Sequence, residues 1–356
     1  MITALATIIV LGILIFVHEL GHFLVAKLCG VRVEAFSLGF PPKLVHKQIG
    51  DTDYRLSVVP LGGYVKLLGE NPNDEVPPES EPYSFSHHPL WHRFLIVLAG
   101  PTFNLLFAVV ALFLIFALAG IPYLTTEIGG VKADSPAARA GLEKGDRVLK
   151  VDQQPMARWD EVAQKIRQAG ASPVVLTVKR GEKVFEVRVT PEPMEAQDLF
   201  GSKVSALLIG ISATDQVAME PVGVFRALEE GGLGTFRLCW LTLQSIYKLL
   251  AGEVPLNSLG GPILIAQVAG KQAKLGVAHL VNFMAVLSVN LFLLNLLPIP
   301  ILDGGHLLFF VVEAIRRKPV PVKHREVAQG FGLMLILALM ILVFYQDILR
   351  LVSAPH

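Results

Sequence analysis

The sequence contains few cysteines and few charged residues. Its 356 residues include only two cysteines, Cys29 and Cys239, which lie far apart along the chain. This pattern excludes a disulfide framework and a cysteine-rich zinc site. Charged residues make up 17% of the chain, against about 25% in an average soluble domain. The formal net charge of +1 carries no electrostatic signal for nucleic acid, which we do not expect as a partner.

Hydrophobic residues make up 53% of the chain and gather in four long runs, at 2–17, 94–118, 280–302 and 330–345. A membrane helix needs about 20 mostly apolar residues. The second and third runs meet this length, as does the first, because its apolar pattern continues past residue 17 to about Ala26, and the fourth is somewhat shorter. The first run lacks the basic start and the small-residue cleavage site of a secretory signal peptide. The sequence therefore predicts a polytopic α-helical membrane protein with four transmembrane helices.

Lysine and arginine are unevenly distributed among the segments that connect these runs. No basic residue precedes Lys27, whereas seven lie within 27–93 and five within 316–325. Because loops rich in lysine and arginine stay in the cytoplasm, these two segments are expected on the cytoplasmic side. Both termini and the long stretch between the second and third runs are then expected to be extracytoplasmic.

The stretch 121–193 has the pattern of a small soluble α+β domain. Residues 159–170 form an amphipathic helical pattern that ends at a glycine, and alternating strands flank a turn at 180–182. Together with the preceding Ala140-Gly141-Leu142 and Gly145-Asp146, this order resembles a bacterial PDZ domain. PDZ domains bind extended peptides or free C-termini along a sheet edge. Peptide binding and a purely steric role at the mouth of the site both remain open.

The first apolar run ends in HELGH, residues 18–22. Residues four apart share one face of a helix, so His18 and His22 can direct imidazole nitrogens at one point, with Glu19 beside them. H-E-x-x-H is the spacing of zinc peptidases, in which the histidines bind the metal and the glutamate is the general base. Charged side chains at membrane depth cost at least about 2.5–3.5 kcal/mol each. We therefore predict a metal site rather than a chance cluster.

A catalytic zinc site needs a third protein ligand and an open position for water. The third run ends in NLLPIPILDGGH, where Asp303 is the only carboxylate. Asp303 is the predicted third ligand, with an interfacial helix cap as the alternative, and His306 is assigned a supporting or structural role. His18 lies about 26 Å along an ideal helix from Met1, within a hydrocarbon core of about 30 Å. Asp303, near the cytoplasmic end of its run, is expected at a matching depth.

The two prolines before Asp303 interrupt the third run. Pro298 and Pro300 cannot continue a regular helix, and non-helical backbone at membrane depth is tolerated only where protein or a watery cavity covers it. We therefore expect 295–303 to form an extended cavity wall, where Asn295 could hydrogen-bond the backbone of a substrate. Asn104 is another intramembrane amide, for which a role at the site and a hydrogen bond between helices remain open.

HELGH, GPTFN at 100–104 and NLLPIPILDGG together resemble the site-2 protease family over nearly the whole chain. The single PDZ-like domain resembles its bacterial RseP branch, although some members of that branch have two such domains. The resemblance implies a zinc-dependent intramembrane endopeptidase of the bacterial inner membrane. Its substrates would be single-span membrane proteins within the lipid bilayer, such as anti-sigma factors or remnant signal peptides.

The resemblance also implies roles for individual residues. Zn²⁺ would be held at His18, His22 and Asp303, with Glu19 as the base. Asn295, Pro298 and Pro300 match a stretch that contacts the substrate backbone, and we include Asn104 among the candidate substrate-binding residues. The alternating stretch 31–69 predicts β-hairpins beside the first helix and matches a membrane-re-entrant sheet that pairs with substrate.

These inferences give an expected order of segments. The amphipathic pattern of 223–251 predicts one or two helices on the outer membrane surface, with packing on the soluble domain as the alternative. The expected divisions are a first transmembrane helix (1–28), a cytoplasmic-side re-entrant β-hairpin loop with a flexible segment (29–91), a second transmembrane helix (92–120), a PDZ domain (121–193), an extracytoplasmic linker with membrane-surface helices (194–278), a third transmembrane helix (279–303), a cytoplasmic loop (304–326) and a fourth transmembrane helix (327–350).

Two other classes of function use the same features. A membrane metal-binding or transport protein would employ the same ligands, but it would need a continuous polar path, and the fourth run offers none. A catalytically inactive scaffold that binds peptides through the PDZ-like domain would have no need of a general base, and Glu19 is present. The paired motifs therefore favour the protease.

Overall fold

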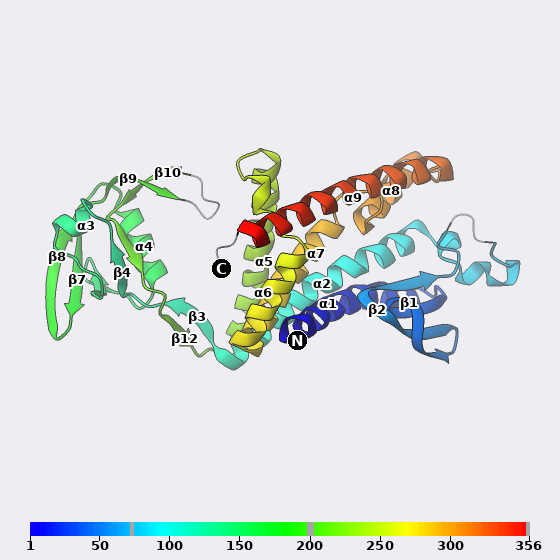
Figure 1. Cartoon of the computed structure of the whole chain (residues 1–356), viewed down its shortest axis with the longest axis horizontal. Helices are drawn as coiled ribbons and strands as arrows, with labels where there is room; N and C mark the ends of the chain where they lie inside the picture. The colour runs from blue at the N-terminus through cyan, green and yellow to red at the C-terminus, as the bar shows by residue number, and fades with distance from the viewer. Residues whose placement is uncertain (72–74, 198–202, 354–356) are drawn as a thin grey trace. The chain divides into compact units, whose positions relative to one another are not determined.

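The computed structural model describes residues 1–71, 75–197 and 203–353 (Figure 1). Within these ranges, four helices are long and apolar enough to cross a membrane, as the four runs predicted. They are α1 (Ile2–Leu28), α2 (Leu90–Ala119), α7 (Val277–Asn295) and α9 (Val322–Ser353). The chain forms two compact units, one built from Met1–Ile115 with Leu228–His356 and the other from Phe116–Ala227.

In the first unit, α1 packs closely against α2. A Cβ at Gly21 of α1 would overlap the carbonyl oxygen of Ala99, and a Cβ at Gly100 of α2 would overlap the ring of His22. Small residues at such positions let two membrane helices approach closely. The N-terminal half of α1 buries Val10 and Leu14 in a separate apolar cluster, which also includes residues of α6 (Pro262–Leu275) and α7. Helix α1 therefore has packing partners in both halves, while much of its surface stays exposed.

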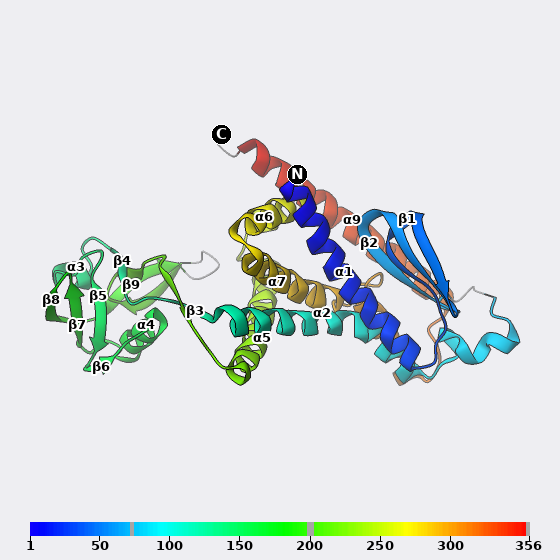
Figure 2. The same ribbon diagram turned by 90° about the horizontal axis from the view of Figure 1, so that it is seen from below.

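The hairpins predicted over 31–69 are present as two long strands, β1 (Val33–Ile49) and β2 (Thr52–Leu67), which lie beside α1 (Figure 2). Val33 pairs with Leu67 and Ile49 pairs with Thr52, while Ala35–Leu38 also face Asp53–Leu56. Each strand therefore bends back along its length, and the first half of β1 lies between two segments of β2. Insertion of this sheet into the membrane stays a prediction.

Aromatic packing attaches the sheet to α1. The ring of Phe36 in β1 lies 5.9 Å from Phe16 and 5.1 Å from Phe23, measured between ring centroids. Phe36 itself is buried. Such offset aromatic contacts add about 0.5–1.5 kcal/mol beyond the burial of apolar area. The sheet is therefore fixed next to the half of α1 that carries HELGH.

The expectation of a flexible segment after the hairpins is wrong for its second half. Residues 78–87 form two short 3₁₀ helices, η1 (Pro78–Tyr83) and η2 (Phe85–His87). Phe85 is buried, with its ring centroid 6.4 Å from that of Phe310, and its backbone N–H donates to the Leu68 carbonyl. One buried aromatic side chain thus holds a Pro-rich stretch in place. The part of this segment at 72–74 lies outside the described residues.

The expected loop at 304–326 also contains regular structure, helix α8 (Asp303–Arg316). Leu307 and Phe310, three positions apart on one helix face, are buried in the same core as Phe85. Glu313 near the end of α8 pairs with Arg93 of α2, with 2.6 Å between Oε1 and Nη2. The helix forms because its apolar face and this ion pair both have partners in the first unit.

The amphipathic stretch before α6 is one helix, α5 (Val224–Leu250). Its Gly231 lies against the backbone of Phe113 in α2. Thr242 Oγ1 donates to Asn290 Oδ1 of α7 at 2.9 Å. Large apolar side chains on the remainder of the helix are exposed, among them Phe236, Trp240 and Tyr247. Within the first unit, α5 therefore packs on α2 and α7 with one face only.

The second unit contains the helix and hairpin predicted for the soluble domain. Its four-stranded antiparallel sheet has the order β6 (Gln154–Pro155), β5 (Arg147–Val151), β7 (Val174–Arg180) and β8 (Lys183–Val189). Helix α4 (Trp159–Gln168) contributes Val162 to a core that also buries Val148 and Leu176 completely. The short helix α3 spans Pro136–Arg139.

This unit extends past the expected boundary at 193. Ile209 is buried in the same core, and Ile211 packs against it, so the segment after 193 supplies part of the domain interior. Its backbone pairs with earlier strands, an arrangement that local sequence patterns do not reveal. The pairs are β9 (Glu192–Gln197) with β10 (Lys203–Leu208), β4 (Ile128–Val131) with β11 (Ile211–Ala213), and β3 (Ile121–Leu124) with β12 (Val217–Glu220).

Asp146 is a buried carboxylate that ties two parts of this domain together. It accepts hydrogen bonds from Arg180 Nε and Nη2 at 2.7 and 2.8 Å and from the Glu143 N–H at 2.9 Å. Burial alone would raise the pKa of this carboxyl, but these donors outweigh burial and hold the pKa below its usual value. Asp146 is therefore a satisfied structural carboxylate.

Candidate metal centre

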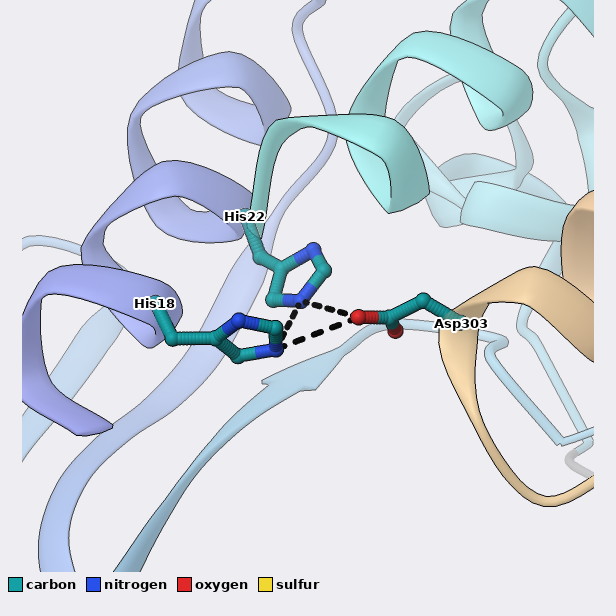
Figure 3. Close-up of side chains that lie close together, drawn as sticks. All are labelled: His18, His22 and Asp303. Atoms are coloured by element: carbon teal, nitrogen blue, oxygen red, sulfur yellow. Dashed lines mark hydrogen bonds and ion pairs between the residues drawn. The ribbon is translucent and has the colours of Figure 1, made fainter. Parts of the chain in front are cut away.

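Three side chains from two distant segments converge in the first unit (Figure 3). His18 and His22 project from α1, and Asp303 projects from the start of α8. The two Nε2 atoms are 3.2 Å apart. Asp303 Oδ2 lies 3.1 Å from His18 Nε2 and 3.7 Å from His22 Nε2. All three residues are half-buried, and one donor atom from each lies within 4.8 Å of the others.

The local sequence explains how Asp303 reaches this point. After α7 ends at Asn295, successive backbone hydrogen bonds close tight turns, including Ile299 N–H to Leu297 and Leu302 N–H to Ile299. The expectation of an extended wall over 295–303 is therefore wrong. The two prolines stop the helix, but the N–H groups of Ile299 and Leu302 still close local turns.

The two glycines after Asp303 allow the start of α8 to fold back against these turns. A Cβ at Gly304 would overlap the carbonyls of Leu296 and Leu297, and a Cβ at Gly305 would overlap the carbonyl of Ile299. Any larger residue would push the two backbone segments apart. The sequence LDGG thus positions the carboxylate through close backbone contact.

Each histidine has a second partner on α2. His22 Nδ1 lies 2.8 Å from the carbonyl oxygen of Ile96, and His18 Nδ1 lies 3.1 Å from Asn104 Nδ2. Ser288 Oγ of α7 donates to the backbone carbonyl of Asn104 at 2.7 Å. Asn104 is completely buried. It therefore lies behind His18, where it contacts a candidate ligand and offers no surface for the substrate contact suggested by sequence.

Glu19 follows His18 directly on α1 and lies beside β2. A Cβ at Gly63 would be only 3.2 Å from Glu19 Cγ, and the backbone of Val65 lies near the Glu19 carboxylate. The edge of β2 thus holds this side chain next to the three converging groups. Sequence reasoning placed Glu19 beside the histidines but did not identify its contact with the sheet.

The donor set fits zinc. Zinc sites in proteins use imidazole nitrogen and carboxylate oxygen at about 2.0–2.2 Å, in tetrahedral geometry, which separates neighbouring donors by about 3.3–3.6 Å. The measured separations of 3.1, 3.2 and 3.7 Å bracket this range. Asp303 Oδ2 is buried, and although His18 Nε2 lies 3.1 Å away, it accepts no hydrogen bond of good geometry among the described residues. A buried carboxylate oxygen without a donor is costly unless a cation meets it.

The remaining predicted residues lie around the turns before α8. Asn295 is half-buried at the end of α7, Pro298 is exposed, and Pro300 packs near Gly332 of α9. Their contact with substrate stays a prediction. Among the described residues, His306 is not part of the group formed by His18, His22 and Asp303, and the supporting role assigned to it stays a prediction.

Sequence reasoning identified Asn104 of α2 as a possible site residue but missed the Ile96 carbonyl and the close approach at Gly100. No sequence motif marks the Ile96 carbonyl, because every residue has a backbone carbonyl. Gly100 and Asn104 both lie in GPTFN, and a glycine four residues before an intramembrane amide was the available signal of a close helix contact.

Comparison with known proteins agrees with this chemistry. The model of peptidase family M50 matches residues 6–339. A protein of Mesorhizobium japonicum, which bears the provisional name of zinc metalloprotease, is 38% identical over 97% of this chain and 98% of its own. Similarly named proteins of Rhizobium meliloti and Vibrio cholerae are 36% and 32% identical, covering 95% and 98% of this chain and 94% and 98% of their own.

Part of the chain also resembles a solved structure. The PDZ domain of an SdrC-like protein from Listeria monocytogenes is 26% identical and matches 26% of this chain and 90% of that domain, with a TM-score of 0.21. The family match and the relatives instead cover nearly the whole chain, including the four apolar helices. The chain belongs to peptidase family M50, the site-2 proteases, and is a multi-pass membrane zinc metalloendopeptidase.

Proposed function

We propose that this protease cleaves peptide bonds inside the transmembrane segments of single-span membrane proteins, with His18, His22 and Asp303 as the zinc ligands. The observation that carries the proposal is the convergence of these three donors at the end of an apolar helix. Ionisable groups are rare at membrane depth and usually serve a function there. A site built at this level suits a substrate bond that also lies within the bilayer.

The chain's own residues divide the chemistry among them. Zinc bound at such a site lowers the pKa of water to about 7 and polarises a carbonyl group. Glu19 accepts the proton of the attacking water and delivers it to the leaving amine. Its contacts with Gly63 and Val65 keep the carboxylate beside the ligands. The carbonyl of Ile96 orients the His22 ring through Nδ1.

Access of substrate to this base requires local unwinding, because a transmembrane helix hides its peptide groups in its own hydrogen bonds. We infer that the β1–β2 sheet re-enters the membrane and receives the unwound segment by strand addition. The contact between β2 and Glu19 supports this, since a strand paired near Val65 would pass close to the base. Asn295, Pro298 and Pro300 are then placed to contact the substrate backbone.

The cellular setting follows from the charge pattern and the relatives. We propose that the protein resides in a bacterial inner membrane, with both termini and the second unit outside the cytoplasm. Anti-sigma factors and remnant signal peptides are the proposed substrates, cleaved in a regulated pathway after another protease has trimmed them. The second unit would select substrates before cleavage, either by binding a peptide end or by excluding bulky proteins.

A reconstituted cleavage assay tests this function. The full chain is placed in liposomes with a single-span test protein, and fragments are mapped by mass spectrometry with and without a zinc chelator. We expect a cut within the transmembrane segment that stops on chelation and returns with added zinc. A His22→Ala variant should give no product, whereas Asn290→Leu should cleave normally. Cuts confined to the exposed parts of the test protein would contradict intramembrane cleavage.

A further inference from the structure

The two histidines of the metal centre have different kinds of partner at Nδ1. The partner of His22 is the Ile96 carbonyl oxygen at 2.8 Å, which can only accept a hydrogen bond. His22 Nδ1 therefore carries the proton of the neutral ring, and its Nε2 lone pair is free to face Asp303 and His18. This is the tautomer that a metal bound at Nε2 requires.

His18 has the opposite arrangement. The hydrogen-bond partner of its Nδ1 is Asn104 Nδ2 at 3.1 Å, and an amide nitrogen can only donate. His18 Nδ1 then accepts, so the proton of the neutral ring lies on Nε2 and points to Asp303 Oδ2, 3.1 Å away. In that tautomer the position that a metal needs on His18 is already taken by hydrogen.

The oxygen of the same Asn104 amide can supply the acceptor that His18 Nδ1 needs. Asn104 Oδ1 is buried and has no hydrogen-bond partner among the described residues, and the whole side chain is inaccessible to solvent. Oxygen and nitrogen of a carboxamide exchange places by a half-turn about the last side-chain bond, with almost no change of shape. The turn would bring an acceptor to His18 Nδ1. Ser288, which holds the Asn104 backbone carbonyl, does not oppose it.

We propose that Asn104 is the positioning residue that fixes the metal-binding tautomer of His18, by turning its Oδ1 toward the Nδ1–H of that ring. This inference rests on the proposed role of His18 as a zinc ligand. Helix α2 then supplies one acceptor to each histidine, the Ile96 carbonyl and the Asn104 side chain, eight residues or about two helical turns apart. Both Nε2 lone pairs face one point only when both acceptors are in place.

Zinc affinity distinguishes the two orientations of the amide. The full-length protein in detergent is titrated with zinc against a chromophoric chelator, so the readout does not depend on proteolysis. Loss of a hydrogen-bond partner behind a ligating histidine costs about 10–100-fold in affinity. We expect that loss for Asn104→Leu, which can neither donate nor accept. Asn104→Asp, which accepts through either oxygen, should bind zinc at least as tightly as the wild type.

A matched control separates this effect from the general loss of a membrane amide. Asn290 on α7 bonds Thr242 instead of a histidine, so Asn290→Leu should leave zinc affinity unchanged. If the amide remained a donor to His18, Asn104→Leu would bind zinc equally or more tightly, and this result would overturn the proposal. Tighter zinc binding by the wild type than by Asn104→Asp would also overturn the proposal.

Two further measurements keep the outcome interpretable. Should Asn104→Leu fail to fold, ¹⁵N spectra of the zinc-loaded wild type labelled at histidine report the tautomer directly, and a proton on His18 Nε2 overturns the proposal. The His22→Ala variant tests whether zinc binds at the proposed site at all. If the wild type binds zinc and His22→Ala does not, but Asn104→Leu equals the wild type, only the role of Asn104 is wrong.

Discussion

The chain contains two histidine pairs with the same spacing, and only one of them is built as a metal centre. His18 and His22 have ring nitrogens 3.2 Å apart, and His88 and His92 have ring nitrogens 3.1 Å apart. The planes of the first pair cross at 82° and those of the second at 39°. Spacing and distance alone therefore do not distinguish a ligand pair from a hydrogen-bonded pair.

The surroundings make the difference. The first pair meets Asp303, and each ring has a partner on α2 at Nδ1. The second pair uses its Nδ1 atoms on each other, so one neutral ring donates to the other, and no carboxylate is grouped with the pair among the described residues. Burial, and then the neighbouring His92, lower the pKa of His88, which favours the neutral ring. A carboxylate from a distant segment is what turns a helical histidine pair into a candidate ligand set.

Removing the Asp303 carboxylate should have the largest effect on the difference between the two histidine pairs. Asp303→Asn keeps the shape of the side chain but removes its charge, so zinc affinity should fall by more than the ~100-fold lost with a partner behind a ligand, and cleavage should cease. Equilibrium dialysis with metal analysis measures the affinity. Asp347→Asn is the control, because Asp347 accepts backbone N–H groups of Gly261, Ile263 and Leu264 instead of facing histidines. Equal zinc binding by Asp303→Asn and the wild type would refute the assignment.

A substitution of Glu19 separates zinc binding from the cleavage step within the HELGH motif. Glu19→Gln should lower the cleavage rate by about 10²–10⁴-fold, the usual contribution of a general base, while zinc affinity stays near that of the wild type. Initial rates on the single-span test protein and zinc titration are measured on the same preparation. A rate near that of the wild type would show that another group accepts the proton.

Much of this centre was predictable from sequence, and the rest depends on groups without a motif. HELGH predicts two candidate ligands and a candidate base on one helix, and Asp303 is the only acid at the end of the third apolar run. The carbonyl of Ile96 and the contact of Val65 with Glu19 are backbone features that any side chain could supply. They depend on how α2 and β2 dock on α1, and local periodicity contains no information on that docking.

The fold shows the same limit. The four spanning helices and the central elements of the second unit follow from apolar runs and alternation, which are local. Helix α8 was expected as a loop because its apolar face spans only four turns next to charged residues, and its burial depends on Phe85 and Arg93. Ile209 joins the core of the second unit from beyond the expected boundary because its partners lie far back in the chain.

Asp146, the buried carboxylate of the second unit, provides a comparison with Asp303, because an arginine already pairs with it. Asp146→Ala should destabilise that unit by about 2 kcal/mol, less than the 3–5 kcal/mol of a fully buried pair because Arg180 remains 37% exposed. Zinc affinity should not change. Hydrogen exchange of the second unit in the full chain measures the loss, and unchanged protection would show that the Arg180 pair contributes nothing.

Acid provides an independent check on Asp146. Since the folded-state pKa lies below the unfolded value of about 3.9, the pair contributes its full stability above that pH and loses it as the pH falls toward the folded value. Protection from exchange in the second unit of the wild type, relative to the intrinsic exchange rate at each pH, should therefore fall more steeply below about pH 4 than in Asp146→Ala. Parallel profiles for the two proteins would contradict the assignment.

The smallest effect is expected at the other histidine pair. The double variant His88→Ala with His92→Ala removes two imidazoles and should leave both zinc stoichiometry and cleavage rate unchanged, because the pair has no carboxylate in its group and no role at the centre. Metal analysis of the purified protein measures the stoichiometry. Loss of a zinc ion in this variant would place a second metal site at the start of α2.

X-ray absorption at the zinc edge tests the central assignment most directly. The spectrum of the zinc-loaded wild type should show two imidazole nitrogens and one or more oxygens at about 2.0–2.2 Å, and the variant His18→Ala with His22→Ala should bind no zinc in the same environment. A sulfur shell at about 2.3 Å, pointing to Cys29 or Cys239, or an unchanged spectrum in the double variant, would contradict a centre formed by His18, His22 and Asp303.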